Sequence, residues 1–261
     1  MLFIQGKVAE IRLMRAEMAN KLQPEDLHTI RQHLDAINQC EAVKVLILRG
    51  EGKYFCSGYD ISDIQNSQHE GCSFGEMVDA IEQCRPITIA ALHGGVYGGA
   101  TDMALACDFR LGSSRTEMFM PAARLGLHFY KQGLERYVTR LGLDTAKRLF
   151  LTCERLDAQA MKDCGFLTHL AAEDAFEQSL QTLTTALCQM APLPLLGMKK
   201  HLNLIARQQH NAQDIAQAVL QTIHSHDLQE GSRDMTCRKA AVPGRRNGRP
   251  PSSGPDAPWI R

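Results

Sequence analysis

The sequence has no excess of charge of either sign, because its 261 residues include 29 lysines and arginines and 29 aspartates and glutamates. A chain without net charge has no overall field that would draw it to nucleic acid or to an anionic membrane. It also lacks any apolar run of ~18 residues, the length that a membrane-spanning helix needs, and it lacks the basic and apolar segments of a secretory signal at its N-terminus. We therefore expect a cytoplasmic protein with no membrane or nucleic-acid partner.

Paired cysteines are also missing, because the nine cysteines are odd in number and none forms a C-x-x-C pair. This usage is typical of a reducing compartment and predicts no disulfide framework. The cysteines and histidines do not show the ligand spacing of a zinc site either. His224 and His226 stand two positions apart, and on a helix such side chains point in different directions and could not chelate one ion. We predict no bound metal.

The charge is unevenly distributed, since residues 231–261 hold seven basic and two acidic residues. The stretch 243–251, PGRRNGRPP, is rich in proline, glycine and arginine and cannot form a packed helix. Apart from Trp259, this segment has no aromatic side chain that could stack on bases. We expect a disordered basic tail that is solvated rather than bound to nucleic acid.

Apolar strands and amphipathic helices alternate in the first half of the chain, which predicts an α/β fold built from βαβ units. Residues 8–13 alternate in polarity as a half-buried strand does, and 43–48 form the continuous apolar run of a strand covered on both faces. A second apolar strand is expected at 87–92, and the second half of the chain is predominantly helical. The expected helices are 24–39, 74–84, 132–141, 144–151, 157–164, 173–190, 195–207 and 212–228.

Two glycine-containing segments follow the buried strands and are suited to bind an anion. Residues 57–60 read SGYD, and residues 98–102 read GGATD. In the second segment the glycines open a helix, whose first N–H groups lack partners within the helix and carry the positive end of its dipole. Glycine also lets a ligand approach the backbone closely. Either segment alone could reflect tight packing, so the inference depends on the pair.

Together the two segments resemble the signatures of the enoyl-CoA hydratase/isomerase (crotonase) family. Residues 55–61, FCSGYDI, are similar to its F-C-[AS]-G-x-D-[IL] segment. Residues 95–108, GVYGGATDMALACD, are similar to its glycine-rich segment, which ends in E-[LI]-A-x-x-C-D. The resemblance covers residues 2–230, and weaker matches lie at 15–20 and 122–127.

The resemblance implies that the backbone N–H groups of Tyr59 and Gly99 form an oxyanion hole for the oxygen of an acyl-CoA thioester as it becomes an enolate. It further implies that coenzyme A binds as part of the substrate and that no other cofactor is present. Asp60 is expected to act structurally, by an ion pair or by capping the next turn. The residues expected to line the coenzyme A path are Ser57, Gly58, Tyr59, Asp60, Ile61, Ser62, Gly98 and Gly99.

The two glutamates that hydratases of the family use for proton transfer are both absent. The first position holds Asp102, a shorter carboxylate on the helix that carries Gly99, and we predict that it acts as a base or holds water. The second position holds Ala122, which cannot transfer a proton. His128 and Tyr130 lie in a loop that approaches the acyl pocket in the family and are candidates to replace it. A purely structural role stays open for Asp102, His128 and Tyr130.

We therefore predict a crotonase-type α/β spiral of ββα units with a helical C-terminal region. Its expected parts are a spiral core at 1–190, a helical region at 191–230 and the basic tail at 231–261. The leading function is enoyl-CoA hydratase/isomerase chemistry, and the resemblance implies a homotrimer or a dimer of trimers. Isomerisation, decarboxylation, thioester hydrolysis, and acyl-CoA binding without catalysis are alternatives, because Ala122 replaces a glutamate. The acyl chain is not determined by the sequence.

Overall fold

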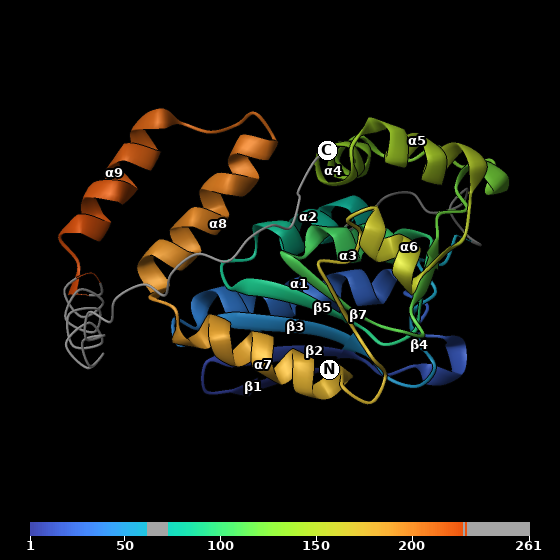
Figure 1. Ribbon diagram of the computed structural model, residues 1–261, viewed down its shortest axis with the longest axis horizontal. Helices are drawn as coiled ribbons and strands as arrows, with labels where there is room; N and C mark the ends of the chain where they lie inside the picture. Colours follow the sequence, from blue (N-terminus) through green and yellow to red (C-terminus); the bar gives the residue numbers. More distant parts are fainter. Residues whose placement is uncertain (62–72, 227, 229–261) are drawn as a thin grey trace, which may run out of the picture.

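The computed structural model describes residues 1–61, 73–226 and 228, and two sheets with their helices form its core (Figure 1). The predicted basic tail, 231–261, lies outside the described residues, as does Ser62 of the predicted coenzyme A path. No helix within the described ranges is long and apolar enough to cross a membrane.

The larger sheet has six strands in the order β1-β2-β3-β5-β7-β10, and the smaller sheet has four in the order β4-β6-β8-β9. Neighbouring strands are parallel except for β1 with β2 and β8 with β9. The larger sheet comprises β1 (Leu2–Gln5), β2 (Val8–Leu13), β3 (Val45–Gly50), β5 (Ile87–Leu92), β7 (Phe109–Ser113) and β10 (His169–Ala171). The smaller comprises β4 (Tyr54–Cys56), β6 (Gly95–Tyr97), β8 (Glu117–Phe119) and β9 (Leu156–Asp157).

The chain repeatedly adds one strand to the larger sheet, one to the smaller sheet and then a helix. β3 leads through β4 to α2, and β5 leads through β6 to α3, so successive ββα units stack into a spiral. This arrangement confirms the predicted α/β spiral with a helical C-terminal region. The helices are α1 (Pro24–Gln39), α2 (Phe74–Gln83), α3 (Gly99–Ala106), α4 (Lys131–Leu141), α5 (Leu143–Thr152), α6 (Ala158–Asp163), α7 (Phe176–Gln189), α8 (Pro192–Ala206) and α9 (Ala212–Ile223), with 3-10 turns η1 (Ala16–Met18) and η2 (Ala123–Leu125).

The central strands of the larger sheet are buried on both faces, as the apolar run at 43–48 predicted. Along β3, Leu46 and Leu48 belong to a core cluster with residues of α1, α2 and α3, whereas Val45 and Ile47 belong to a second cluster with residues of α7. Side chains alternate along a strand, so each face of the sheet supplies one cluster. This pattern places the helices α1, α2 and α3 on one face and α7 on the other.

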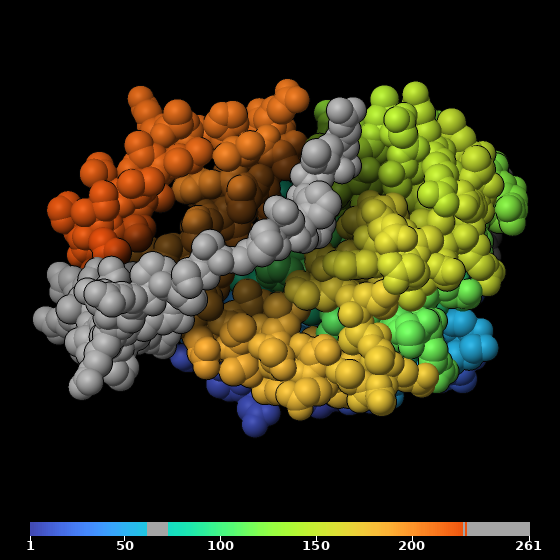
Figure 2. Space-filling model, viewed as in Figure 1, coloured from blue at the N-terminus to red at the C-terminus, as the bar shows by residue number. Residues whose placement is uncertain are grey.

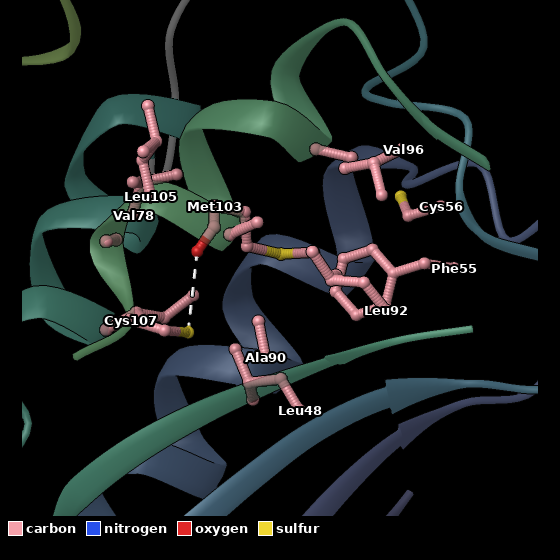
Figure 3. Packing of buried hydrophobic residues seen from close by; sticks show 14 of the residues in the cluster. Leu48, Phe55, Cys56, Val78, Ala90, Leu92, Val96, Met103, Leu105 and Cys107 are labelled. Atoms are coloured by element: carbon pink, nitrogen blue, oxygen red, sulfur yellow. Dashed lines mark hydrogen bonds between the residues drawn. The ribbon is translucent and has the colours of Figure 1, made fainter. Parts of the chain in front are cut away.

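Figure 3 shows the packing of the inner face of β5 near the helix that carries the glycine-rich segment. Ala90 and Leu92 of β5 and Met103 of α3 are each at most 2% exposed. All three belong to one core cluster, together with Ala100 near the start of α3. The N-terminus of α3 is therefore held in place by the core rather than by solvent-exposed contacts.

The helices α8 and α9 extend from the spiral as an arm (Figure 1). The first of them begins at Pro192 rather than at the predicted 195, because proline is tolerated in the first turn, where its missing N–H has no helical partner. The arm is attached through Lys199, whose Nζ lies 2.7 Å from Asp108 Oδ2. Asn203 of the same helix donates a hydrogen bond to the Glu82 carbonyl oxygen at 3.0 Å.

We expect Lys199→Met to lower the free energy of unfolding by about 3 kcal/mol, because removing one partner of a buried ion pair leaves the other charge unpaired. Urea denaturation followed by circular dichroism measures the change. Lys200→Met, on the exposed side of the same helix, is the matched control and should change the value by less than about 0.5 kcal/mol. Equal destabilisation by the two variants would contradict a role for the Lys199–Asp108 pair.

Candidate active site

The two predicted glycine segments meet at the ends of β4 and β6. A β-carbon on Gly58 would lie 2.9 Å from the Tyr97 carbonyl oxygen and 3.3 Å from the Gly99 nitrogen, so the two backbones touch. Gly58 also has a φ of +104° and Gly98 a φ of +54°, which favour glycine. Close approach and backbone conformation thus both explain the glycine at 58.

The backbone N–H of Tyr59 faces the second segment. On either side of Tyr59, Leu22 N–H donates to Gly58 O at 2.8 Å and Asp60 N–H donates to Leu22 O at 2.8 Å. Because consecutive peptide groups of an extended chain point in opposite directions, the Tyr59 N–H is directed away from Leu22. Within the described residues this N–H has no acceptor.

The N–H of Gly99 is the first of α3 and has no acceptor within the described residues either. The neighbouring groups are occupied, since Gly98 N–H donates to Phe119 O at 3.1 Å and Thr101 N–H donates to Gly98 O at 3.0 Å. The Gly99 N–H also carries the positive end of the α3 dipole. Two amides without an acceptor among the described residues therefore lie where the two glycine segments touch.

Asp102 lies one turn further along α3 and its side chain is 0% exposed. Its Oδ2 accepts a hydrogen bond from Arg136 Nη1 at 2.6 Å and another from the Tyr130 hydroxyl. Its Oδ1 has no partner among the described residues, although it is buried. Burial raises the pKa of Asp102, and the guanidinium of Arg136 offsets only part of this effect. The carboxylate thus has one oxygen held by the protein and one buried oxygen without a partner among the described residues.

Arg136 of α4 is fully buried and is surrounded by carboxylates. Besides Asp102 it contacts Asp79 Oδ1 at 2.6 Å and Glu82 Oε1 at 3.1 Å, both from α2. Burial alone would lower the pKa of Arg136, but Asp102 and Glu82 outweigh it and raise the pKa, so the guanidinium stays charged. Arg207, at the end of α8, also contacts Asp79 and Glu82, which connects the arm to this charged cluster.

An aromatic cluster borders the unpaired amides and Asp102. Phe74, the first residue of α2, packs against the Tyr59 ring with centroids 5.6 Å apart and against the Tyr130 ring with centroids 6.2 Å apart. A β-carbon on Gly99 would lie 2.7 Å from Phe74 Cζ, so the Phe74 ring touches the Gly99 backbone. Burial raises the pKa of Tyr130, and the Asp102 carboxylate raises it further, so its hydroxyl keeps its proton.

The structure brings together Tyr59, Gly99, Asp102 and Tyr130 of the predicted site residues. Ala122 is 5% exposed and directly precedes η2, but its methyl group offers no proton transfer. His128 is exposed and its Nδ1 contacts the Phe129 carbonyl oxygen at 2.8 Å rather than Asp102.

Of the predicted coenzyme A path, residues 57–61 lie in the first segment, and Gly98 and Gly99 lie in the second. Asp60 has the structural contacts that were expected, because its Oδ2 lies 2.6 Å from Lys21 Nζ and accepts from Gln23 Nε2 at 3.0 Å. Ser57 is half-buried, and Ile61 is 38% exposed. These positions leave the edge of the segment accessible to a ligand.

Sequence reasoning missed Arg136 and Phe74. For Arg136 the sequence held only a weak signal. Arg136 and Arg140 are four residues apart on one helix, so they are expected to share a face of that helix. This spacing does not predict that carboxylates of α2 contact that face. Phe74 was placed at a helix start, yet its contact with Gly99 depends on tertiary packing.

In the ranges that the structure describes, no group of three or more histidine, cysteine or acidic side chains could hold a metal ion.

The chain is similar in sequence to proteins of one known family. Residues 4–240 match the enoyl-CoA hydratase/isomerase family. The chain is 30% identical over 183 residues to enoyl-CoA hydratase AKT6-1 from Alternaria alternata, which is 69% of this chain and 60% of that protein. It is 28% identical over 212 residues to a peroxisomal Δ(3,5)-Δ(2,4)-dienoyl-CoA isomerase from Arabidopsis thaliana, which is 74% of this chain and 76% of that protein.

Solved structures of enoyl-CoA hydratase/isomerase proteins have a similar fold. An enoyl-CoA hydratase from Bacillus anthracis superposes with a TM-score of 0.82 at 25% identity, over 91% of this chain and 96% of that one. A further enoyl-CoA hydratase/isomerase family member superposes with a TM-score of 0.85 at 24% identity, over 91% and 95%. The match to AKT6-1 spans about three fifths of that relative's length. Because the family match extends over nearly the whole chain, this protein belongs to the enoyl-CoA hydratase/isomerase family.

Proposed function

We propose that this protein binds an acyl-CoA thioester and stabilises its enolate at the N–H groups of Tyr59 and Gly99. The observation that carries the proposal is the pair of unpaired amides beside each other, with a carboxylate one helical turn away. Two N–H donors aimed at a carbonyl oxygen favour the charge that develops on it when a proton leaves the α-carbon. The coenzyme A part would lie along Ser57, Gly58 and Ile61, with Asp60 holding that segment to Lys21.

Asp102 is the proposed base of this site. Its Oδ2 is held by Arg136 and Tyr130, whereas its Oδ1 is the oxygen without a partner. In an isomerisation, Oδ1 removes a proton from C2 of a 3-enoyl thioester, the electron pair moves onto the thioester oxygen, and the same proton returns to C4. One carboxylate suffices for this cycle. Hydration requires a second group to position water, and the aligned position holds the apolar Ala122, so this observation favours the double-bond shift over hydration.

Asp102→Asn should lower kcat for the conversion of 3-hexenoyl-CoA to its 2-enoyl isomer by about 10²- to 10⁴-fold, the range expected for a lost general base. Absorbance of the conjugated product measures the rate. Asp102 must be ionised to accept a proton, and burial raises its pKa. The wild-type kcat/KM should therefore fall as pH falls through this raised pKa, and the residual activity of the variant should lack this acid limb.

Asp144→Asn, an exposed substitution on α5, is the matched control and should leave rate and pH profile unchanged. Crotonyl-CoA measured in parallel reports hydration. A faster hydration than isomerisation would contradict the proposed preference. Tight thioester binding without turnover of either substrate would instead support an acyl-CoA-binding protein without catalytic activity.

Gly58→Ala should lower kcat/KM by about 10²-fold or more, because a methyl group there would push the Tyr59 and Gly99 amides apart, and losing one oxyanion donor has an effect of this size. Gly6→Ala is the matched control: Gly6 also has a positive φ, of +57°, but a β-carbon there would meet nothing within 4 Å. The control should lose about 1 kcal/mol of stability from the left-handed backbone without a loss of activity. Equal activity of the two variants would argue against the amide pair.

We also propose that the chain assembles as a homotrimer through the arm formed by α8 and α9. These two helices form one side of the molecule (Figure 2), and several of their large apolar side chains are exposed in the single chain. Apolar side chains that stay exposed together on one part of a surface are typical of protein interfaces. The exposed apolar residues are Leu193, Met198, Leu202 and Ile205 on α8, and Val219, Leu220 and Ile223 on α9.

Sedimentation equilibrium should give a mass of three or six times the 29.0 kDa of one chain. Leu202→Glu should shift this mass toward the monomer, because Leu202 is 65% exposed in the single chain and a charge there could not be buried. Lys200→Glu, two positions away on α8, is the control for added negative charge. An unchanged mass in Leu202→Glu would place the interface elsewhere.

A further inference from the structure

We propose that Phe74 and Tyr130 form an aromatic wall that admits only short acyl groups to the site. The inference rests on the proposed function, because it takes the Gly99 N–H as the carbonyl site and Asp102 as the base. It assigns a substrate class, short-chain acyl-CoA thioesters, and two residues that determine specificity.

The position of the reacting carbons follows from α3. Gly99 and Asp102 are three residues apart on one helix, so neighbouring groups on that face are about 5 Å apart. A thioester whose oxygen meets the Gly99 N–H must place the carbons next to its carbonyl along this turn if Asp102 Oδ1 is to reach them. The rest of the acyl chain has to leave from the same turn.

Phe74 covers the Gly99 end of this turn. Its ring touches the Gly99 backbone, and its Cε1 would lie 3.0 Å from a β-carbon at Gly99. The start of α2 fixes the ring in place, because Glu76 N–H donates to Ser73 Oγ at 3.2 Å and Ser73 N–H donates to Glu76 Oε2 at 2.8 Å. This reciprocal cap makes Phe74 the first helical residue.

Tyr130 covers the Asp102 end. Its hydroxyl donates to Asp102 Oδ2, and its ring lies 3.1 Å from the position of a β-carbon on Gly75. The ring also meets Phe74 edge to face and packs against Phe129 with centroids 4.6 Å apart. Tyr130 is thus fixed at its hydroxyl and along its ring, and it cannot turn aside without losing these contacts.

The wall limits the length of chain that can follow the reacting carbons. Both residues are half-buried, so neither ring is fully enclosed by the protein. A butyryl or crotonyl group ends close to this turn, whereas a decanoyl group continues and must displace a ring that is held at several points. In enclosed apolar sites a single methylene changes kcat/KM by about 10- to 200-fold. We therefore expect a preference for short chains of at least about tenfold.

Isothermal titration with butyryl-CoA and decanoyl-CoA tests the proposal, because these saturated thioesters bind without being converted. Wild type should bind butyryl-CoA at least about tenfold more tightly than decanoyl-CoA. Phe74→Ala should remove or reverse this preference by tightening decanoyl-CoA, with butyryl-CoA changed by less than about threefold. Phe74→Leu should give an intermediate ratio, and this variant keeps the test valid if the alanine variant does not fold by circular dichroism.

Two further variants separate the effect of the aromatic wall from the effect of the Tyr130 hydroxyl and from the general loss of an aromatic ring. Tyr130→Phe keeps the ring and removes the hydroxyl, so the chain-length ratio should stay within about threefold of wild type even where turnover changes. Phe3→Ala, at a 44% exposed phenylalanine of β1, controls for the loss of an aromatic ring and should not change the ratio.

The outcomes distinguish this inference from the proposed function. Wild-type binding of both thioesters with equal affinity, or a Phe74→Ala ratio equal to that of wild type, would overturn the aromatic wall and leave the proposed function standing. Failure of wild type to bind either thioester would overturn both. Butyryl-CoA preference without turnover of any enoyl thioester would support the wall and contradict the proposed catalysis.

Discussion

The buried ion pair between Asp102 and Arg136 is the interaction on which the candidate site depends. Burial disfavours the charge on every group in this region, and one guanidinium can offset that cost only by meeting several carboxylates in good geometry. Arg136 does so by contacting Asp102 of α3 and Glu82 of α2 from its own position on α4. The three helices are thereby fixed relative to one another. Phe74 at the start of α2 is held over Gly99 at the start of α3 as a consequence.

The backbone around Gly58 imposes a second constraint that is independent of charge. The Tyr59 amide can lie beside Gly99 only because residue 58 has no β-carbon and adopts a positive φ. The contacts of Leu22 on both sides of Tyr59 then direct its N–H away from Leu22. The positions of both amides are therefore determined by packing before any ligand arrives, as the proposed oxyanion site would require.

The sequence predicted the local features of the site and missed the long-range ones. Tyr59, Gly99 and Asp102 were predicted from short motifs, because the glycines and the carboxylate of each motif lie within a few residues of one another. The apolar run at 43–48 likewise predicted that β3 is buried on both faces. The contacts of Arg136 could not be predicted, because they join helices whose order in space depends on the spiral. His128 and Tyr130 were both candidates because this loop approaches the acyl pocket in the family. Of the two, the Tyr130 hydroxyl reaches Asp102, whereas His128 is exposed.

A hydrogen bond joins Asp102 and Tyr130 and bears on both the proposed base and the proposed acyl pocket. An aspartate is one methylene shorter than the glutamate of the family's hydratases, and the Tyr130 hydroxyl occupies the space next to the shorter carboxylate. The same hydrogen bond engages Oδ2 and leaves Oδ1 without a partner among the described residues, and it contributes to the position of the Tyr130 ring. In the proposed site this contact selects the base oxygen, whereas the packing of the Tyr130 ring against Phe74 and Phe129 sets the size of the acyl pocket. With Ala122 at the second position, this contact is compatible with transfer of a single proton on a small acyl group, and less compatible with the placement of a water molecule between two carboxylates.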